Sequence, residues 1–169
     1  MASVTDLKSL LESKDPGTLR RHASLALTER NYEKSLKLYT AAIALEPANG
    51  ANYLRRYKTY RRVSSMIESM AGNVAALKLP TSLSQLSPGD FAVRMIRDLD
   101  SAISLQGWDK KSGYNGDTKK DKSAVEALES RASLLTSQAN CTFASMDYNL
   151  LLALPKASVG GDGKIKEYR

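Results

Sequence analysis

Asn31 to Pro47, NYEKSLKLYTAAIALEP, is the stretch from which the fold of the whole chain can be argued. Its apolar residues recur at spacings of three and four, which predicts an amphipathic α-helix that ends at the proline. Such a helix has to bury its apolar side against another element. The fold therefore depends on whether this helix is isolated or belongs to a repeated unit.

The helix does belong to a unit that occurs twice. A shift of 109 places aligns the region around it with the C-terminal third of the chain. In both copies an alanine of the first helix lies nineteen residues before a packing residue of the second helix, which predicts a repeated helix-turn-helix. The aligned pairs are Leu19 and Leu128, Ala23 and Ala132, Asn31 and Asn140, Tyr39 and Tyr148, Ala42 and Leu151, Ile43 and Leu152, and Leu45 and Leu154.

A third copy lies between these two and is interrupted. Tyr57 follows Ala23 by 34 residues, which is a known repeat period. The second helix of this copy, FAVRMIRDLDSAISLQ, ends with the same pattern as the opening stretch. From Tyr57 to Ala102, however, the distance is 45 residues instead of nineteen. The sequence therefore predicts an insertion of about 26 residues between the paired helices, with its irregular part at about 72–87.

These residues carry a family resemblance. NYEKSLKLYTAAIALEPANG resembles the second helix of a tetratricopeptide repeat followed by the start of the next repeat. The resemblance covers roughly Pro16 to Lys156 as three repeats, with a bulky Tyr57 where a small residue is usual. It implies an all-α fold, a superhelix of antiparallel helix pairs with a concave groove. It also implies a protein-interaction adaptor or scaffold of the co-chaperone type.

The expected domain organisation follows from the repeats and from the helix signals. Residues 1–15 form an N-terminal capping segment, and residues 16–158 form the three-repeat domain. A polar, glycine-containing loop is expected at 107–122, before a capping box that begins at Ser123. Residues 159–169 are expected to be a flexible tail.

Composition excludes several classes of function. The chain has one cysteine, Cys141, and one histidine, His22, so an internal disulfide and a His-rich metal site are excluded, and no cofactor is expected. No stretch reaches the roughly 18 to 20 apolar residues of a membrane span. The N-terminus lacks the apolar centre of a secretory signal, which favours a cytoplasmic protein, although a chain trimmed of its signal would look the same.

The net charge of +7 favours an anionic partner, and it is concentrated in NYLRRYKTYRR, Asn52 to Arg62. On a helix, the tyrosines of this stretch share a face with Ser64 and Ile67 and are expected to pack inward. The resemblance places the other side of the helix in the groove, with Arg20 flanking it. The candidate partner-binding residues are Arg20, Leu54, Arg55, Lys58, Arg61 and Arg62.

Three interpretations of this basic helix remain open. Its cations could capture an acidic or C-terminal carboxylate peptide by charge-assisted hydrogen bonds. The run could instead be a solvated helix face. A third possibility is nucleic-acid binding, in which cations hold phosphates and tyrosines stack on bases. An enzyme is not expected, because no pair of reactive groups occurs at a usable spacing.

The resemblance also allows a test for one class of partner. Co-chaperones that bind the C-terminal tails of large heat-shock chaperones use a carboxylate clamp of basic residues and asparagines. The corresponding positions here are Arg20, Ser24, Arg55, Glu126 and Ser130. Only Arg20 fits, and Glu126 would repel a carboxylate. Chaperone-tail binding by that clamp is therefore not expected, and a client segment or a larger complex is the better match.

Overall fold

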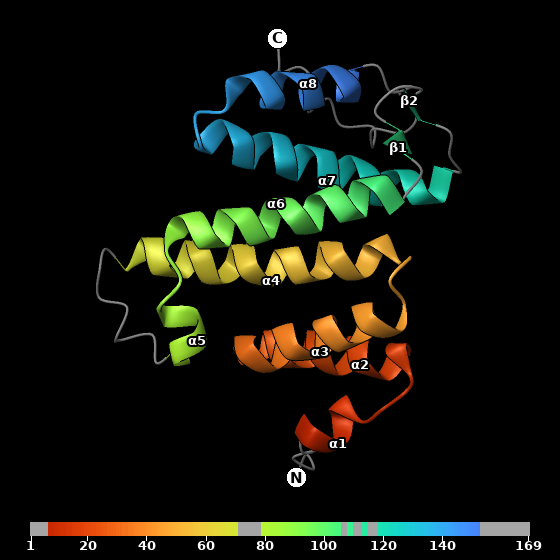
Figure 1. Cartoon of the computed structure of the whole chain (residues 1–169), viewed down its shortest axis with the longest axis vertical. Coiled ribbons are helices and arrows are strands. Elements are labelled where there is room, and N and C mark those ends of the chain that lie inside the picture. Colours follow the sequence, from red (N-terminus) through yellow and green to blue (C-terminus); the bar gives the residue numbers. More distant parts are fainter. Residues whose placement is uncertain (1–6, 71–78, 106–107, 110–112, 115–117, 153–169) are drawn as a thin grey trace. The chain divides into compact units, whose positions relative to one another are not determined.

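The fold is built almost entirely of helices (Figure 1). The structure is a computed structural model, and it describes residues 7–70, 79–105, 108–109, 113–114 and 118–152. The helical content confirms the predicted all-α class. The chain divides into two compact units, residues 1–98 and 99–169, which are described separately below. Among the residues that the structure places, no helix combines the length and apolarity needed to cross a bilayer. The helices are α1 (Leu7–Leu11), α2 (Pro16–Thr28), α3 (Tyr32–Leu45), α4 (Gly50–Ser69), α5 (Thr81–Ser84), α6 (Pro88–Leu105), α7 (Thr118–Ser137) and α8 (Cys141–Leu152).

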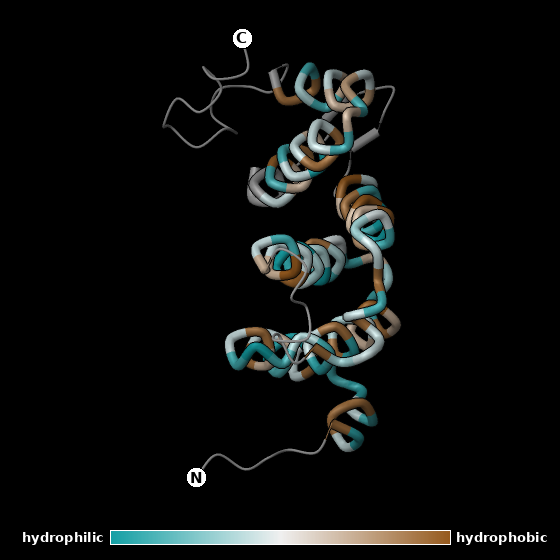
Figure 2. Tube along the Cα trace, turned by 90° about the vertical axis from the view of Figure 1, so that its left-hand side faces the viewer, coloured by the Kyte–Doolittle hydropathy of each residue, from teal (hydrophilic) through white to brown (hydrophobic). Residues whose placement is uncertain are grey.

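The core of the first unit begins between α2 and α3. Apolar and polar residues are interspersed along the helices (Figure 2). Small alanines at the contact let the two helix backbones approach closely, and larger side chains fill the space around them. α1 adds one buried leucine from the N-terminal segment. The cluster consists of Leu10, Leu19, Ala23, Leu38, Tyr39 and Ala42.

The turn between α2 and α3 has a counterpart between α7 and α8, 109 residues later. Arg30 and Ala139 occupy equivalent places and have positive φ angles of 59° and 56°. A left-handed residue just after a helix is a common helix ending, and it directs the chain back along the same core. The two helix-helix turns thus have the same backbone conformation. The closing hydrogen bonds run from Asn31 N to Ala26 O at 2.8 Å and from Asn140 N to Leu135 O at 2.9 Å.

The prediction of a loop over residues 107–122 is wrong at its C-terminal end, from residue 118 onward. α7 begins at Thr118, so Ser123 lies inside the helix and does not start it. The physical reason is that no glycine or proline occurs from Thr118 to Ser137, and the intervening charged residues tolerate a helix well. Two short strands also occur in the predicted loop. β1 (Trp108–Asp109) pairs antiparallel with β2 (Gly113–Tyr114).

The predicted insertion contains one short helix. α5 lies between α4 and α6, and its Leu83 is buried. Residues 71–78 and the predicted tail at 159–169 lie outside the described residues, as does the predicted domain boundary at 158. The insertion therefore contributes a buried apolar side chain to the first unit.

Two helices that begin at a proline, α2 and α6, carry side-chain caps. Asp15 accepts from the amides of Gly17 at 3.0 Å and Thr18 at 2.8 Å, at the start of α2. At the start of α6, Asp90 accepts from the amide of Ser87 at 2.9 Å, and the Ser87 hydroxyl accepts from the amide of Asp90 at 3.1 Å. These caps fix where the two helices begin.

Replacing Asp15 with alanine is expected to lower the melting temperature at neutral pH and to have a smaller effect in acid. The side-chain and backbone hydrogen bonds of Thr18 hold the pKa of Asp15 below its ordinary value of 3.8. A carboxyl group whose pKa is lower in the folded chain than in the unfolded chain stabilises the fold at pH values above its unfolded-state pKa. This stabilisation is lost as the pH falls through the folded-state pKa. Thermal unfolding of both proteins at about pH 7 and about pH 2.5 measures this. A difference in melting temperature that does not narrow in acid would contradict the role of the carboxylate.

Candidate partner-binding surface

The inward side of α4 is apolar and aromatic, as the sequence predicted. Tyr57, Tyr60 and Ser64 are buried, while Tyr53 and Ile67 are half-buried. The ring of Tyr60 meets the edge of another aromatic ring, that of Phe91 in α6, with centroids 6.3 Å apart. The tyrosines of this helix therefore belong to the core of the first unit.

The outward side of α4 is basic. Arg55, Lys58, Arg61 and Arg62 are all exposed, and we call these four residues the basic face. Their spacing of three and four places them on one side of the helix. Within the described residues, no carboxylate forms an ion pair with Arg55, Arg61 or Arg62. The basic face can thus offer guanidinium donors to an external anion.

A shallow pocket lies within this basic surface. It has a volume of about 410 Å³. Its lining combines cationic heads, one hydroxyl and one thioether, and includes no acidic side chain. The hydroxyl of the buried Tyr32 donates a hydrogen bond to the thioether sulfur, Met66 Sδ, at 2.8 Å, which restricts the position of the Met66 side chain. The lining residues are Lys58, Arg61, Arg62, Ser65 and Met66.

One arginine of the basic run is not part of the surface. Arg56 donates from Nε and Nη2 to the two carboxylate oxygens of Asp98 in α6, at 3.0 and 2.6 Å. A further bond runs from Nη1 to Thr40 Oγ1 at 3.0 Å, and the guanidinium lies 5.9 Å from the ring centroid of Tyr53. The candidate partner-binding residues predicted from the sequence left Arg56 out, but no partner for it was predicted. In the structure it links α4 to α6.

Burial dominates the electrostatics of this pair. Asp98 is only 1% exposed, and the loss of solvation raises its pKa even though the hydrogen bond and charge of Arg56 act in the opposite direction. Burial alone would lower the pKa of Arg56, but the hydrogen bond and charge of Asp98 outweigh it, and that pKa is raised. Each group therefore depends on the other to remain charged in the interior.

The same arginine–aspartate fork occurs in the second unit. Arg131 of α7 donates from Nε and Nη2 to Asp147 of α8 at 2.8 and 2.6 Å, and its Nη1 pairs with Asp100. The two forks occupy equivalent places in the second and third sequence repeats, so aligning those repeats would have identified them. Arg56 and Arg131 directly precede Tyr57 and Ala132, and Asp98 and Asp147 lie four residues before Ala102 and Leu151.

Two of the predicted site residues are not open to a partner. Leu54 is 4% exposed, so its expected place on the groove surface is wrong. The reason is that α4 has few aliphatic residues, and its leucine turns inward with Tyr57. Arg20 is half-buried and pairs with Glu46, which also accepts from Asn49 Nδ2 at 2.9 Å. The Asn49 bond, followed by Arg20, keeps the pKa of Glu46 below its usual range.

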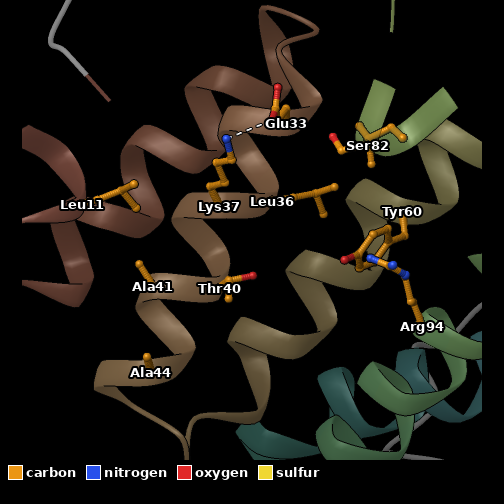
Figure 3. A pocket seen from close by; sticks show the side chains of 11 residues that line it. Leu11, Glu33, Leu36, Lys37, Thr40, Ala41, Ala44, Tyr60, Ser82 and Arg94 are labelled. Atoms are coloured by element: carbon orange, nitrogen blue, oxygen red, sulfur yellow. Dashed lines mark ion pairs between the residues drawn. The ribbon is translucent and has the colours of Figure 1, made fainter. Parts of the chain in front are cut away.

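Sequence reasoning missed a second concavity in the first unit. It has a volume of about 480 Å³, and Figure 3 shows its side chains converging from several helices. Glu33 and Lys37 form an ion pair of 2.9 Å at its edge, and Arg94 lies over the ring of Tyr60 at 5.9 Å. It shares no lining residue with the pocket in the basic face. The lining residues are Leu11, Glu33, Leu36, Lys37, Thr40, Ala41, Ala44, Tyr60, Ser82, Leu83 and Arg94.

Other types of site find little support in the described residues. No group of three histidine, cysteine or acidic side chains among them is placed to hold a metal ion. Comparison of the chain with models of protein families, with curated proteins and with solved structures gives no match.

Proposed function

We propose that the protein is a helical-repeat interaction module whose basic face binds an acidic segment of a partner protein. The observation that carries this proposal is the separation of charge on α4. Arg56 is used internally, whereas Arg55, Lys58, Arg61 and Arg62 are exposed. Maintaining several like charges on one helix face costs stability, which an anionic partner would offset. The module would act by binding, without catalysis of its own.

The tetratricopeptide-like architecture is part of this proposal. Two structural features support a repeated helix pair. One is the pair of matching left-handed turns at Arg30 and Ala139, and the other is the pair of matching forks of Arg56 and Arg131. Repeats of this type stack into a superhelix whose concave side presents the first helix of each pair. In such a stack the basic face of α4 would lie in the groove. A scaffold or co-chaperone-like role would fit that arrangement.

An acidic protein segment is favoured over nucleic acid by the state of the tyrosines. Single-stranded nucleic acid is bound by cations together with aromatic rings on which bases stack. Tyr57 and Tyr60 are buried, and the hydroxyl of the half-buried Tyr53 donates to the carbonyl of Pro47 at 3.1 Å. The basic face thus offers charge without exposed stacking surfaces. Nucleic acid remains the alternative that the experiment has to distinguish.

The double variant Arg61→Glu/Arg62→Glu is expected to bind a fluorescent polyglutamate peptide at least about tenfold more weakly than the unaltered protein, because two charge-assisted contacts become repulsive. Fluorescence anisotropy measures the affinity, and circular dichroism checks that the helices persist. The matched control is Lys14→Glu/Arg21→Glu, which changes the net charge equally at exposed positions outside α4.

Capture from cell lysate with the same proteins, with and without nuclease, completes the test. Partner proteins that are lost only with the α4 variant would support the proposal. Equal loss of affinity in both double variants would mean that net charge alone matters, and the proposed site would be rejected. Partners lost on nuclease treatment would identify nucleic acid as the ligand.

A further inference from the structure

The pocket in the basic face differs from the rest of that surface in the kind of donors it brings together. Lys58, Arg61 and Arg62 extend from adjacent turns of one helix, and the Ser65 hydroxyl follows one turn later. Because all four come from helix α4, the backbone fixes the positions of their Cα atoms on neighbouring turns. Arg55, one turn earlier, is exposed but does not line the pocket. The pocket is therefore a localised cluster of donors.

The pocket has more positive charge than one carboxylate can balance. Its two guanidinium groups, those of Arg61 and Arg62, form no ion pair with a described carboxylate, and no acid lines the pocket. The acidic residue of α4, Glu68, accepts a hydrogen bond from Ser64 at 2.9 Å and is not part of the lining. A carboxylate brings one negative charge and two oxygens. A phosphate monoester brings close to two charges and three strong acceptor oxygens, so it can engage two guanidinium forks and an ammonium together.

The geometry points to a binding site for a phosphate monoester dianion, carried by a phosphorylated side chain of the partner segment. This inference rests on the proposed function and narrows it. The guanidinium groups of Arg61 and Arg62 and the ammonium of Lys58 bind the phosphate oxygens, and Ser65 adds a hydroxyl donor. Met66, fixed by its hydrogen bond from Tyr32, provides an apolar wall for the carbon atoms that carry the phosphate.

The test compares three peptides of alternating glutamate and glycine that differ only at the centre. The centre is phosphoserine, a single glutamate, or a pair of glutamates that matches the charge of phosphoserine. By fluorescence anisotropy at physiological salt, the phosphoserine peptide is expected to bind about tenfold more tightly than the glutamate-pair peptide. This preference should shrink below about pH 6, where the phosphate takes up its second proton. The glutamate-pair peptide reports any effect of pH on the protein itself.

Variants locate the site. Lys58→Gln, Arg61→Gln and Arg62→Gln together should abolish the preference for phosphoserine, whereas Lys14→Gln, Arg21→Gln and Arg30→Gln together, which remove the same charge at exposed positions outside α4, should retain it. Equal binding of the phosphoserine and glutamate-pair peptides would overturn the dianion site and leave the proposed acidic-peptide function standing. A preference that survives the first triple variant would also overturn it. If no peptide binds and a single-stranded oligonucleotide does, both the inference and the proposed function fail.

Discussion

Replacing Arg56 with alanine is expected to reduce the free energy of unfolding by about 3–5 kcal/mol, the cost of leaving one partner of a buried ion pair alone. Asp98, its partner, has a side chain that is only 2% exposed, against 17% for Arg56. In the variant, the buried carboxylate loses two hydrogen bonds and its counter-charge. It would have to be buried uncompensated, take up a proton, or pull α6 away from α4. Urea unfolding followed by circular dichroism measures the loss.

The neighbouring arginine provides a matched control. Arg55 lies beside Arg56 in α4 but is exposed and forms no ion pair with a described carboxylate. Arg55→Ala should change the stability by less than about 0.5 kcal/mol, as is usual for surface substitutions. Equal effects of the two substitutions would contradict the assignment of Arg56 to the interior.

A double substitution distinguishes the loss of the whole ion pair from the loss of one of its partners. Arg56→Met with Asp98→Leu removes both charges and keeps apolar volume at the contact. Replacing a buried ion pair with packed apolar residues is often neutral or stabilising. The double variant is therefore expected to recover most of the stability lost in Arg56→Ala. Failure to recover would mean that the volume or the Thr40 hydrogen bond, rather than the uncompensated charge, explains the loss.

Much of the fold was predictable because it depends on local periodicity. The apolar spacing in 31–47 predicts α3, and the same spacing 109 residues later predicts α8. The cap at Asp15 is likewise a local signal, because a carboxylate before a proline in the first turn can accept from the free amides at the start of α2. The start of α7 was misplaced, because Ser123 begins a capping-box pattern that is also compatible with a helix interior. A capping pattern can therefore occur inside a helix as well as at its start, and the residues before it determine whether the helix begins there.

The candidate site was predictable only in part, for a different reason. Periodicity correctly turned the tyrosines of α4 inward, and it left Arg55, Lys58, Arg61 and Arg62 outside. It did not identify the partner of Arg56, which the candidate residues had left out, because that partner is 42 residues away. A long-range ion pair leaves no trace in local spacing. Comparison between repeats could have revealed it, since the equivalent place holds Arg131.

Phe91→Ala is expected to reduce the free energy of unfolding by about 3–5 kcal/mol, because it removes a large buried side chain and leaves a cavity. Phe91 is 1% exposed and lies in the first turn of α6, where its ring and that of Tyr60 form a T-shaped pair. It follows the insertion directly, so it is an early anchor of α6 on α4. Val93→Ala is the matched control, because Val93 is on the same helix but 62% exposed, and a change below about 0.5 kcal/mol is expected.

The same variant tests whether the two sides of α4 act independently. Phe91 packs on the inward side, whereas the basic face is on the outward side. If α4 is a rigid element, protein that remains folded in Phe91→Ala should bind the polyglutamate peptide as tightly as the unaltered protein. Anisotropy titrations at a temperature well below the melting point of the variant make the comparison. A weaker affinity of the folded variant would mean that the packing of α6 positions the arginines, so that the interior and the basic face form one coupled site.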